Sequence, residues 1–252
     1  MLWGETGTSF QEKLWRTDMG KTIQNEAEFS AIQENLAKKI DLSNRVAVSE
    51  IKTISAIDLA YWNKGEREYA VCCIVTVDCG TKGVTEVKYS ADEITVPYIP
   101  GFLSFRELPL VLNTYKLLEH KLDLLMFDGN GYLHHRHMGI ATHAAIELDE
   151  PAIGVAKSYL KIGGVDFIMP KNDVGVFTDI TLNGEVSGRA LRTRRDVKPM
   201  FVSCGNWISL DRATEITLSL VNSESRQPLP LRLADIETRK IRSVLVATNW
   251  NV

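Results

Sequence analysis

The chain has 252 residues and is 44% hydrophobic, which is enough to build a buried core. Its 29 Lys and Arg residues and 32 Asp and Glu residues give a formal net charge of -3 at pH 7, which excludes nucleic-acid binding through a uniformly basic surface. No apolar run has the length of a membrane span, and the first residues do not have the pattern of a signal peptide, so we expect a cytoplasmic protein. The four cysteines form no Cys-x-x-Cys pair and are expected as reduced, buried thiols.

The N-terminal half of the chain contains both helix-like and strand-like patterns. Apolar residues recur at helical spacing over residues 28–40, whereas residues 51–58 and 70–78 are apolar or β-branched runs. A helix over residues 104–118 and a mostly apolar strand over 122–128 follow. The predicted order in this part is therefore a helix, a hairpin of two strands, a second helix and a further strand.

The C-terminal half continues the alternation. We expect a helix over residues 139–148, strands over 152–156 and 199–204, and helices over 210–221 and 233–242. Strands that alternate with helices indicate a parallel core in the sheet. An antiparallel hairpin joined to such a core predicts an α/β fold, with a ribonuclease H-like mixed sheet flanked by helices.

Three acidic residues indicate metal-assisted chemistry. Asp58 interrupts an otherwise apolar strand, and Asp128 ends another strand just before a glycine. Two carboxylates that meet across a sheet repel each other unless a cation compensates them, and magnesium or manganese suits oxygen-only ligands. The alternatives are structural: Asp58 ends its strand, Asp128 opens a turn, and Glu107 is favoured by the dipole of a helix N-terminus.

Four of the five histidines lie between His134 and His143, so zinc is an alternative metal. No cysteine cluster accompanies these histidines, and the nearby acids favour a harder ion. One imidazole at the site would order a water or contact a phosphate. Lys157 ends an apolar run; beside acids and a metal it would stabilise charge on a phosphate oxygen, and otherwise it extends into solvent.

Two further features concern what is bound. Tyr98 lies between Pro97 and Pro100, so its ring is held stiffly and suits insertion into a base stack, although an ordinary half-buried turn is the alternative. Residues 188–198 form the strongest local basic patch of the chain. This patch either follows a phosphate backbone or is a solvated segment.

These segments resemble the endonuclease V family, nucleases that recognise deaminated purines. The resemblance extends from about residue 27 to residue 239, and its motifs lie at residues 57–61, 97–107, 128–134, 139–143, 153–158, 191–194 and 231–235. The sequences of residues 58–62 and 191–199 are most similar to a bacterial branch of this family. We accordingly divide the chain into an N-terminal extension (1–26), a nuclease domain (27–242) and a C-terminal tail (243–252).

The resemblance implies a ribonuclease H-like enzyme that uses Mg²⁺, or Mn²⁺ in its place, to cut DNA on the 3′ side of deoxyinosine, one nucleotide beyond the lesion. Such a cut begins the repair of deaminated adenine. Carried over by position, Asp58 and Asp128 would hold the metal, and Glu107 would be a further ligand or would position water. His134 and Lys157 would line the scissile phosphate.

The resemblance also implies how DNA containing deoxyinosine is read. Tyr98 would fill the gap left when the base leaves the duplex. The pocket for the extruded base would be lined mainly by main chain near Gly101, Leu103, Gly139 and Ile140. Arg192 and Arg194, within the basic patch, would contact the DNA backbone. We expect a monomer that does not associate with membranes.

The chain departs from the commoner family pattern at three positions. Asn130 and His135 replace residues common elsewhere, and Asn206 stands where a histidine near the metal is common. An amide cannot carry a proton, although it can still ligate magnesium. Two other functions stay open: an endoribonuclease acting on inosine in single-stranded RNA, and an inosine-binding module that cuts weakly.

Overall fold

The computed structural model describes residues 26–47, 50–120 and 122–250, so almost all of the predicted extension 1–26 lies outside the described residues. Its centre is an eight-stranded sheet with the order β3-β2-β1-β4-β5-β8-β7-β6. The strands are β1 (Thr53–Lys64), β2 (Arg67–Asp78), β3 (Val84–Glu93), β4 (Leu124–Phe127), β5 (Ala152–Ala156), β6 (Phe177–Leu182), β7 (Glu185–Leu191) and β8 (Met200–Asn206).

The sheet is mixed, as predicted. β1 pairs antiparallel with β2 but parallel with β4, and β4 pairs parallel with β5. The remaining pairs are antiparallel. The three central strands therefore form a parallel core, in which the ends of β1, β4 and β5 meet at one edge.

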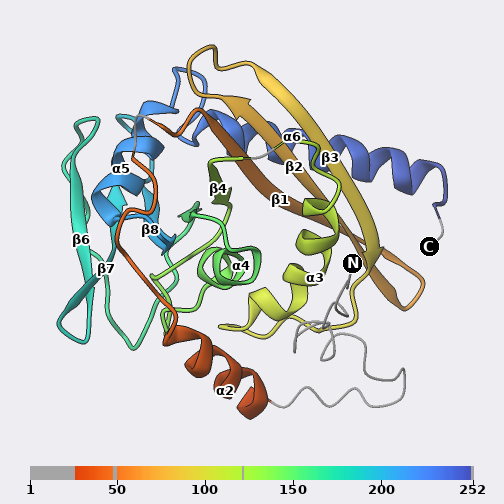
Figure 1. Cartoon of the computed structure of the whole chain (residues 1–252), viewed down its shortest axis with the longest axis horizontal. Helices are drawn as coiled ribbons and strands as arrows, with labels where there is room; N and C mark the ends of the chain where they lie inside the picture. Colours follow the sequence, from red (N-terminus) through yellow and green to blue (C-terminus); the bar gives the residue numbers. More distant parts are fainter. Residues whose placement is uncertain (1–25, 48–49, 121, 251–252) are drawn as a thin grey trace, which may run out of the picture.

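Helices cover both faces of the sheet (Figure 1). They are α2 (Glu26–Ala37), α3 (Leu103–Tyr115), α4 (Ile140–Leu148), α5 (Leu210–Ser219) and α6 (Leu229–Ala247). Within the described ranges, none of these helices is both long and apolar enough to cross a membrane.

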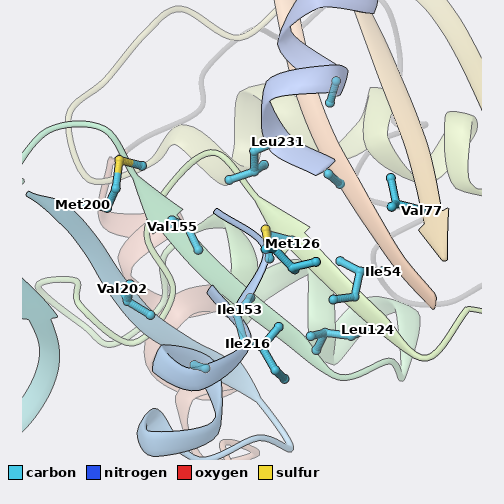
Figure 2. Packing of buried hydrophobic residues seen from close by; sticks show 14 of the residues in the cluster. Ile54, Val77, Leu124, Met126, Ile153, Val155, Met200, Val202, Ile216 and Leu231 are labelled. Atoms are coloured by element: carbon cyan, nitrogen blue, oxygen red, sulfur yellow. The ribbon is translucent and has the colours of Figure 1, made fainter. Parts of the chain in front are cut away.

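The strand β4 shows why its sequence is continuously apolar. Leu124 and Met126 point into the cluster under α5 and α6, which Figure 2 shows from close by. Leu125 and Phe127 point into the opposite cluster, under α3 and α4. A strand covered on both faces has no solvent side, so it has no polar alternation.

Three strands lie outside the sequence prediction. β3 is an edge strand whose residues are all at least partly exposed, so it lacks the apolar run that marks the central strands. β6 and β7 form a hairpin joined by Asn183 and Gly184, both with positive φ. An Asn-Gly pair is a strong hairpin signal, but the surrounding strands are too polar to stand out by composition alone. The last helix also continues to Ala247, past the predicted start of the tail at 243.

Candidate active site

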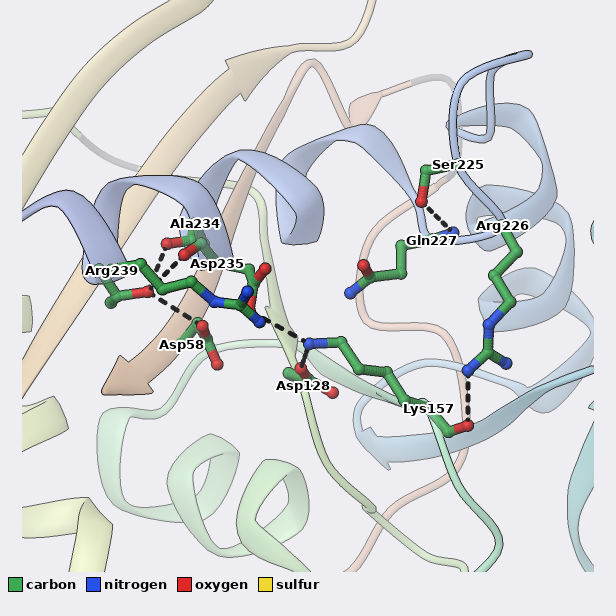
Figure 3. Close-up of polar contacts among 10 residues, drawn as sticks. Asp58, Asp128, Lys157, Ser225, Arg226, Gln227, Ala234, Asp235 and Arg239 are labelled. Atoms are coloured by element: carbon green, nitrogen blue, oxygen red, sulfur yellow. Dashed lines mark hydrogen bonds and ion pairs between the residues drawn. The ribbon is translucent and has the colours of Figure 1, made fainter. Parts of the chain in front are cut away.

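Two predicted acids meet because of strand register. Ile57 of β1 pairs with Phe127 of β4, so the next residues, Asp58 and Asp128, lie side by side at the edge of the parallel core. Lys157 directly follows β5, the next strand along. Its Nζ lies 2.6 Å from Oδ2 of Asp128 (Figure 3). Three neighbouring strands therefore bring two acids and one base together.

The helix α6 adds groups that the sequence prediction did not single out. Asp235 Oδ1 lies 3.4 Å from Nζ of Lys157, and Arg239 donates to the same oxygen at 2.9 Å. The hydroxyl of Thr238 lies 3.0 Å from Oδ2 of Asp58. Acids on an amphipathic helix usually belong to a solvated face, so the available sequence signal for Asp235 is its place in the motif at residues 231–235.

Glu107 approaches from the helix α3, on the other side of β1. Its Oε1 accepts a hydrogen bond from the hydroxyl of Tyr61 in β1. Burial, and then the charge of Asp58, raises the pKa of Glu107 to about 7, although the Tyr61 hydrogen bond opposes that shift. Glu107 can therefore exchange a proton near neutral pH.

Burial makes ionisation of the carboxylates at the site less favourable. Burial, and then repulsion by Asp128, raises the pKa of Asp58 to about 6. Burial also raises the pKa of Asp128, against the pull of Lys157. The pKa of Lys157 is raised because Asp128 and Asp235 outweigh the effect of its burial. Clustered carboxylates with raised pKa values indicate a place where added positive charge is stabilising.

A pocket of about 460 Å³ opens onto these groups. Its lining combines acids with three basic side chains and includes Asp58, Tyr61, Lys157, Asp235, Arg239 and Arg242. An opening of this kind can admit an extended phosphodiester. Its cations can neutralise the phosphate, and its carboxylates line the same opening.

The donor set suits a hard divalent cation better than zinc. Asp58, Asp128, Asp235 and Glu107 offer only oxygen ligands, as magnesium and manganese prefer. Within the part of the chain that the structure describes, no three His, Cys, Asp or Glu residues are arranged to hold an ion. The ammonium of Lys157 instead lies between Asp128 and Asp235. The carboxylates therefore fit the cation chemically, while Lys157 neutralises part of their charge.

The histidines between 134 and 143 are not partners of these acids. His134 uses Nε2 to contact the carbonyl of Gly101 at 3.0 Å, and its Nδ1 accepts from the backbone N–H of Arg136 at 3.3 Å. A carbonyl only accepts, so Nε2 carries the proton. Burial lowers the pKa of His134 to about 3, which keeps the ring neutral. His134 thus joins two loops, and the hydrogen bonds of its ring are not made to a carboxylate.

Five of the residues predicted to read DNA lie on the turns before α3 and α4 or at the first residue of these helices. Tyr98 is 65% exposed and stands on the turn before α3. Gly101 and Leu103 lie at the start of α3, and Gly139 and Ile140 at the start of α4. Gly139 cannot carry a side chain, because a Cβ would lie 2.2 Å from the carbonyl oxygen of Asn130.

The two predicted arginines differ. Arg192 is 7% exposed, and its guanidinium donates to backbone carbonyls, including that of Pro170 at 3.0 Å. It therefore holds a loop together and is not presented to solvent. Arg194 is half-buried. Asn206 is fully buried, and its Oδ1 accepts from the backbone of Asp41 at 2.6 Å.

Comparison with known proteins identifies the fold and the family. A model of the endonuclease V family matches residues 34–236. Endonuclease V of Bacillus thuringiensis subsp. konkukian is 58% identical over 229 residues, which are 91% of this chain and 96% of the relative. The crystal structure of endonuclease V from Bacillus subtilis is 52% identical, with a TM-score of 0.87 over 90% of this chain and 96% of that chain.

A more distant relative has been solved with nucleic acid. Endonuclease V of Ciona intestinalis, in complex with a 24mer DNA containing an inosine followed by a ribo-adenosine, is 27% identical, with a TM-score of 0.77 over 87% of this chain and 98% of that chain. These matches confirm the predicted ribonuclease H-like fold and the bacterial type of the resemblance. The chain belongs to the endonuclease V family, and it is therefore an endonuclease.

Proposed function

We propose that this protein is a Mg²⁺-dependent endonuclease that cuts DNA on the 3′ side of deoxyinosine, one nucleotide beyond the lesion, and so initiates the repair of deaminated adenine. The observation that carries the proposal is the convergence of Asp58, Asp128 and Asp235 on Lys157 beside an open pocket. This arrangement combines oxygen ligands for a metal with a fixed cation for a phosphate.

The chemistry divides among these side chains. Asp58, Asp128 and Asp235 would hold the metal, with Glu107 as a further ligand or as the group that positions the attacking water. When bound, Mg²⁺, or Mn²⁺ in its place, activates water and neutralises charge on the phosphate. Lys157 supplies positive charge for a non-bridging phosphate oxygen. Glu107, with a pKa near 7, can accept the proton that the attacking water loses.

Recognition of the lesion would take place at the turns before α3 and α4. The exposed ring of Tyr98 would enter the space that the extruded base leaves, and the base would enter the pocket between the two turns. The inosine-containing DNA bound by the Ciona relative supports this substrate class. The half-buried Arg194 would contact the backbone of the DNA.

The decisive experiment is strand cleavage of a labelled duplex with one deoxyinosine, with and without Mg²⁺. We expect a Mg²⁺-dependent nick one nucleotide 3′ of the lesion, and its loss in Asp128→Ala. Asp166→Ala is the matched control, because Asp166 is an exposed acid that pairs with Lys161 away from the site. No cleavage with either Mg²⁺ or Mn²⁺, but retained binding of deoxyinosine DNA, would leave an inosine-binding module instead.

One observation favours a second substrate. The DNA bound by the Ciona relative has a ribo-adenosine directly after the inosine, so a 2′-hydroxyl is accommodated at that position in that protein. The same assay with inosine in single-stranded RNA therefore distinguishes two functions. Preferential cutting of the RNA would place the enzyme in RNA metabolism.

A further inference from the structure

A fully buried glutamine of the helix α2 hydrogen-bonds to both turns of the predicted base pocket. Gln33 lies on the same face of α2 as Phe29 and Leu36. Its amide nitrogen donates to the carbonyl of Gly101 at 3.1 Å and to the carbonyl of Met138 at 3.2 Å. One side chain therefore binds the turn before α3 and the turn before α4 together.

Every hydrogen-bonding group of this amide is used. Its Oε1 accepts from Nε of Arg136 at 2.6 Å, while its two N–H groups serve the two carbonyls. The guanidinium of Arg136 lies 4.6 Å from the centre of the Phe102 ring. His134 also contacts the Gly101 carbonyl. Gln33 thus stands at the centre of a network that includes both turns but none of the carboxylates around Lys157.

Without Gln33 the two carbonyls would lose their shared donor. The Gly101 carbonyl would keep His134 and, at 3.5 Å, Nη2 of Arg136 as donors, but the side chain that links it to the Met138 carbonyl would be gone. The apolar contact of α2 with the turn would remain, because Phe29 stacks on Phe105 with the ring centres 3.9 Å apart. Loss of the amide should therefore change the spacing of the turns more than the docking of the helix.

We propose that Gln33 is a positioning residue that sets the spacing between the two walls of the base pocket, and so contributes to selectivity for deoxyinosine. One wall is the turn at Gly101 and Leu103, and the other is the start of α4 at Gly139 and Ile140. The inference rests on the proposed function, in which these walls receive the base. It assigns to α2 a part in recognition, separate from the chemistry at Lys157.

The test uses two variants and one control in the full chain. Gln33→Leu removes all the hydrogen bonds of the amide, and Gln33→Glu keeps an oxygen for Arg136 but replaces the donor nitrogen. Asn35→Ala alters an exposed polar residue of the same helix. Binding is measured by fluorescence anisotropy in EDTA, with a labelled duplex that has one deoxyinosine and with the same duplex unmodified. Cleavage in Mg²⁺ gives kcat and KM.

We expect both Gln33 variants to lose about tenfold in the ratio of the two affinities, the effect of losing two buried hydrogen bonds. KM should rise while kcat stays unchanged, and Asn35→Ala should match the wild type. Hydrogen exchange of the free protein should accelerate at the amides of Phe102 and Gly139, which bond to Ile99 and Gly131 within the two turns. A purely structural role would instead reduce affinity for both duplexes, or lower kcat.

Two results would overturn the inference. The first is a folded Gln33→Leu or Gln33→Glu variant with wild-type selectivity. The second is unchanged exchange at both amides. If Gln33→Leu does not fold, Gln33→Glu, which keeps the size of the side chain, decides the question. A wild-type protein that shows no preference for deoxyinosine DNA is a different result. It would contradict the proposed function, and the role of Gln33 in selectivity would then have no basis.

Discussion

Lys157 lies 2.6 Å from Asp128 and 3.4 Å from Asp235, so its single charge serves two carboxylates. An ammonium in this place has two effects. It lowers the repulsion among the acids of the free protein, and it offers positive charge to a phosphate. These effects can be separated, because the first is a property of the protein alone and the second appears only during cleavage.

Replacing Lys157 by methionine should reveal both effects. We expect kcat for the deoxyinosine duplex to fall by about 100-fold or more, since one fixed group that stabilises developing charge is removed. The melting temperature should also fall at pH 8, because Asp128 loses its cation while Asp235 keeps Arg239, and should partly recover as Asp128, whose pKa burial raises, becomes protonated at lower pH. Lys161→Met, which alters an exposed lysine paired with Asp166, should change neither quantity.

His143 makes a prediction about acid stability. It is fully buried in α4, its Nδ1 lies 2.9 Å from the hydroxyl of Ser104, and burial lowers its pKa from 6.5 to about 4. Between these pH values the unfolded chain binds a proton that the folded chain does not bind. The free energy of unfolding is therefore unaffected by this difference above pH 6.5. It decreases as the pH falls from 6.5 towards 4, because protonation of His143 favours the unfolded chain.

Urea denaturation at pH 7 and at pH 5 measures this loss. We expect His143 to account for about 2 kcal/mol of the decrease in the free energy of unfolding between the two pH values. In His143→Asn, whose amide can still contact Ser104 but does not titrate, the decrease should be smaller by that amount. An equal decrease in wild type and His143→Asn would contradict the assignment.

At the scale of single elements, α6 contributes Asp235, Thr238, Arg239 and Arg242 to the site. Asp235 and Thr238 are about one turn apart on the face of the helix that packs over β1. Asp58 itself is fixed in position by the central strand. The hydroxyl of Thr238 lies 3.0 Å from Oδ2 of Asp58 and 2.7 Å from the carbonyl of Ala234, so it can support that carboxylate as neighbouring groups support the ligands of a metal site.

Thr238→Val keeps the shape of the side chain but removes the hydroxyl. We expect Mn²⁺ affinity, measured by calorimetry, to fall by about tenfold or more, with a comparable loss of cleavage at limiting metal. Ser243→Ala is the control, since Ser243 lies on the same helix and donates to the backbone carbonyl of Arg239. Unchanged Mn²⁺ affinity in a folded Thr238→Val protein would show that Asp58 needs no support from α6.

At the scale of the whole molecule, the sheet explains what the sequence could predict. The sequence indicates Asp58 and Asp128 because each is an acid that ends or interrupts an apolar run. These runs form the buried central strands β1 and β4. The parallel register then brings them together. The mixed sheet was predictable because a hairpin is followed by strands that alternate with helices, and the pairing of β1 with β2 and with β4 confirms it.

The sequence could not predict contacts that depend on how separate elements dock. Asp235 lies on an amphipathic helix, where acids usually face solvent, and only the packing of α6 on β1 brings it to Lys157. Gln33 is polar at a position that the helical pattern assigns to the core, and its partners lie 68 and 105 residues away in the chain. Arg192 looked like part of a basic surface, but it is buried among backbone carbonyls.

The position of α6 along the chain has a consequence for the order in which the site is made. Synthesis proceeds from the N-terminus, and domains generally fold as units during it. The strands that carry Asp58, Asp128 and Lys157 are complete well before Leu229, where α6 begins. A growing chain that still lacks α6 has no Asp235 and no support for Asp58. The centre is therefore completed only after α6 has been synthesised, so a growing chain that lacks α6 carries no assembled nuclease.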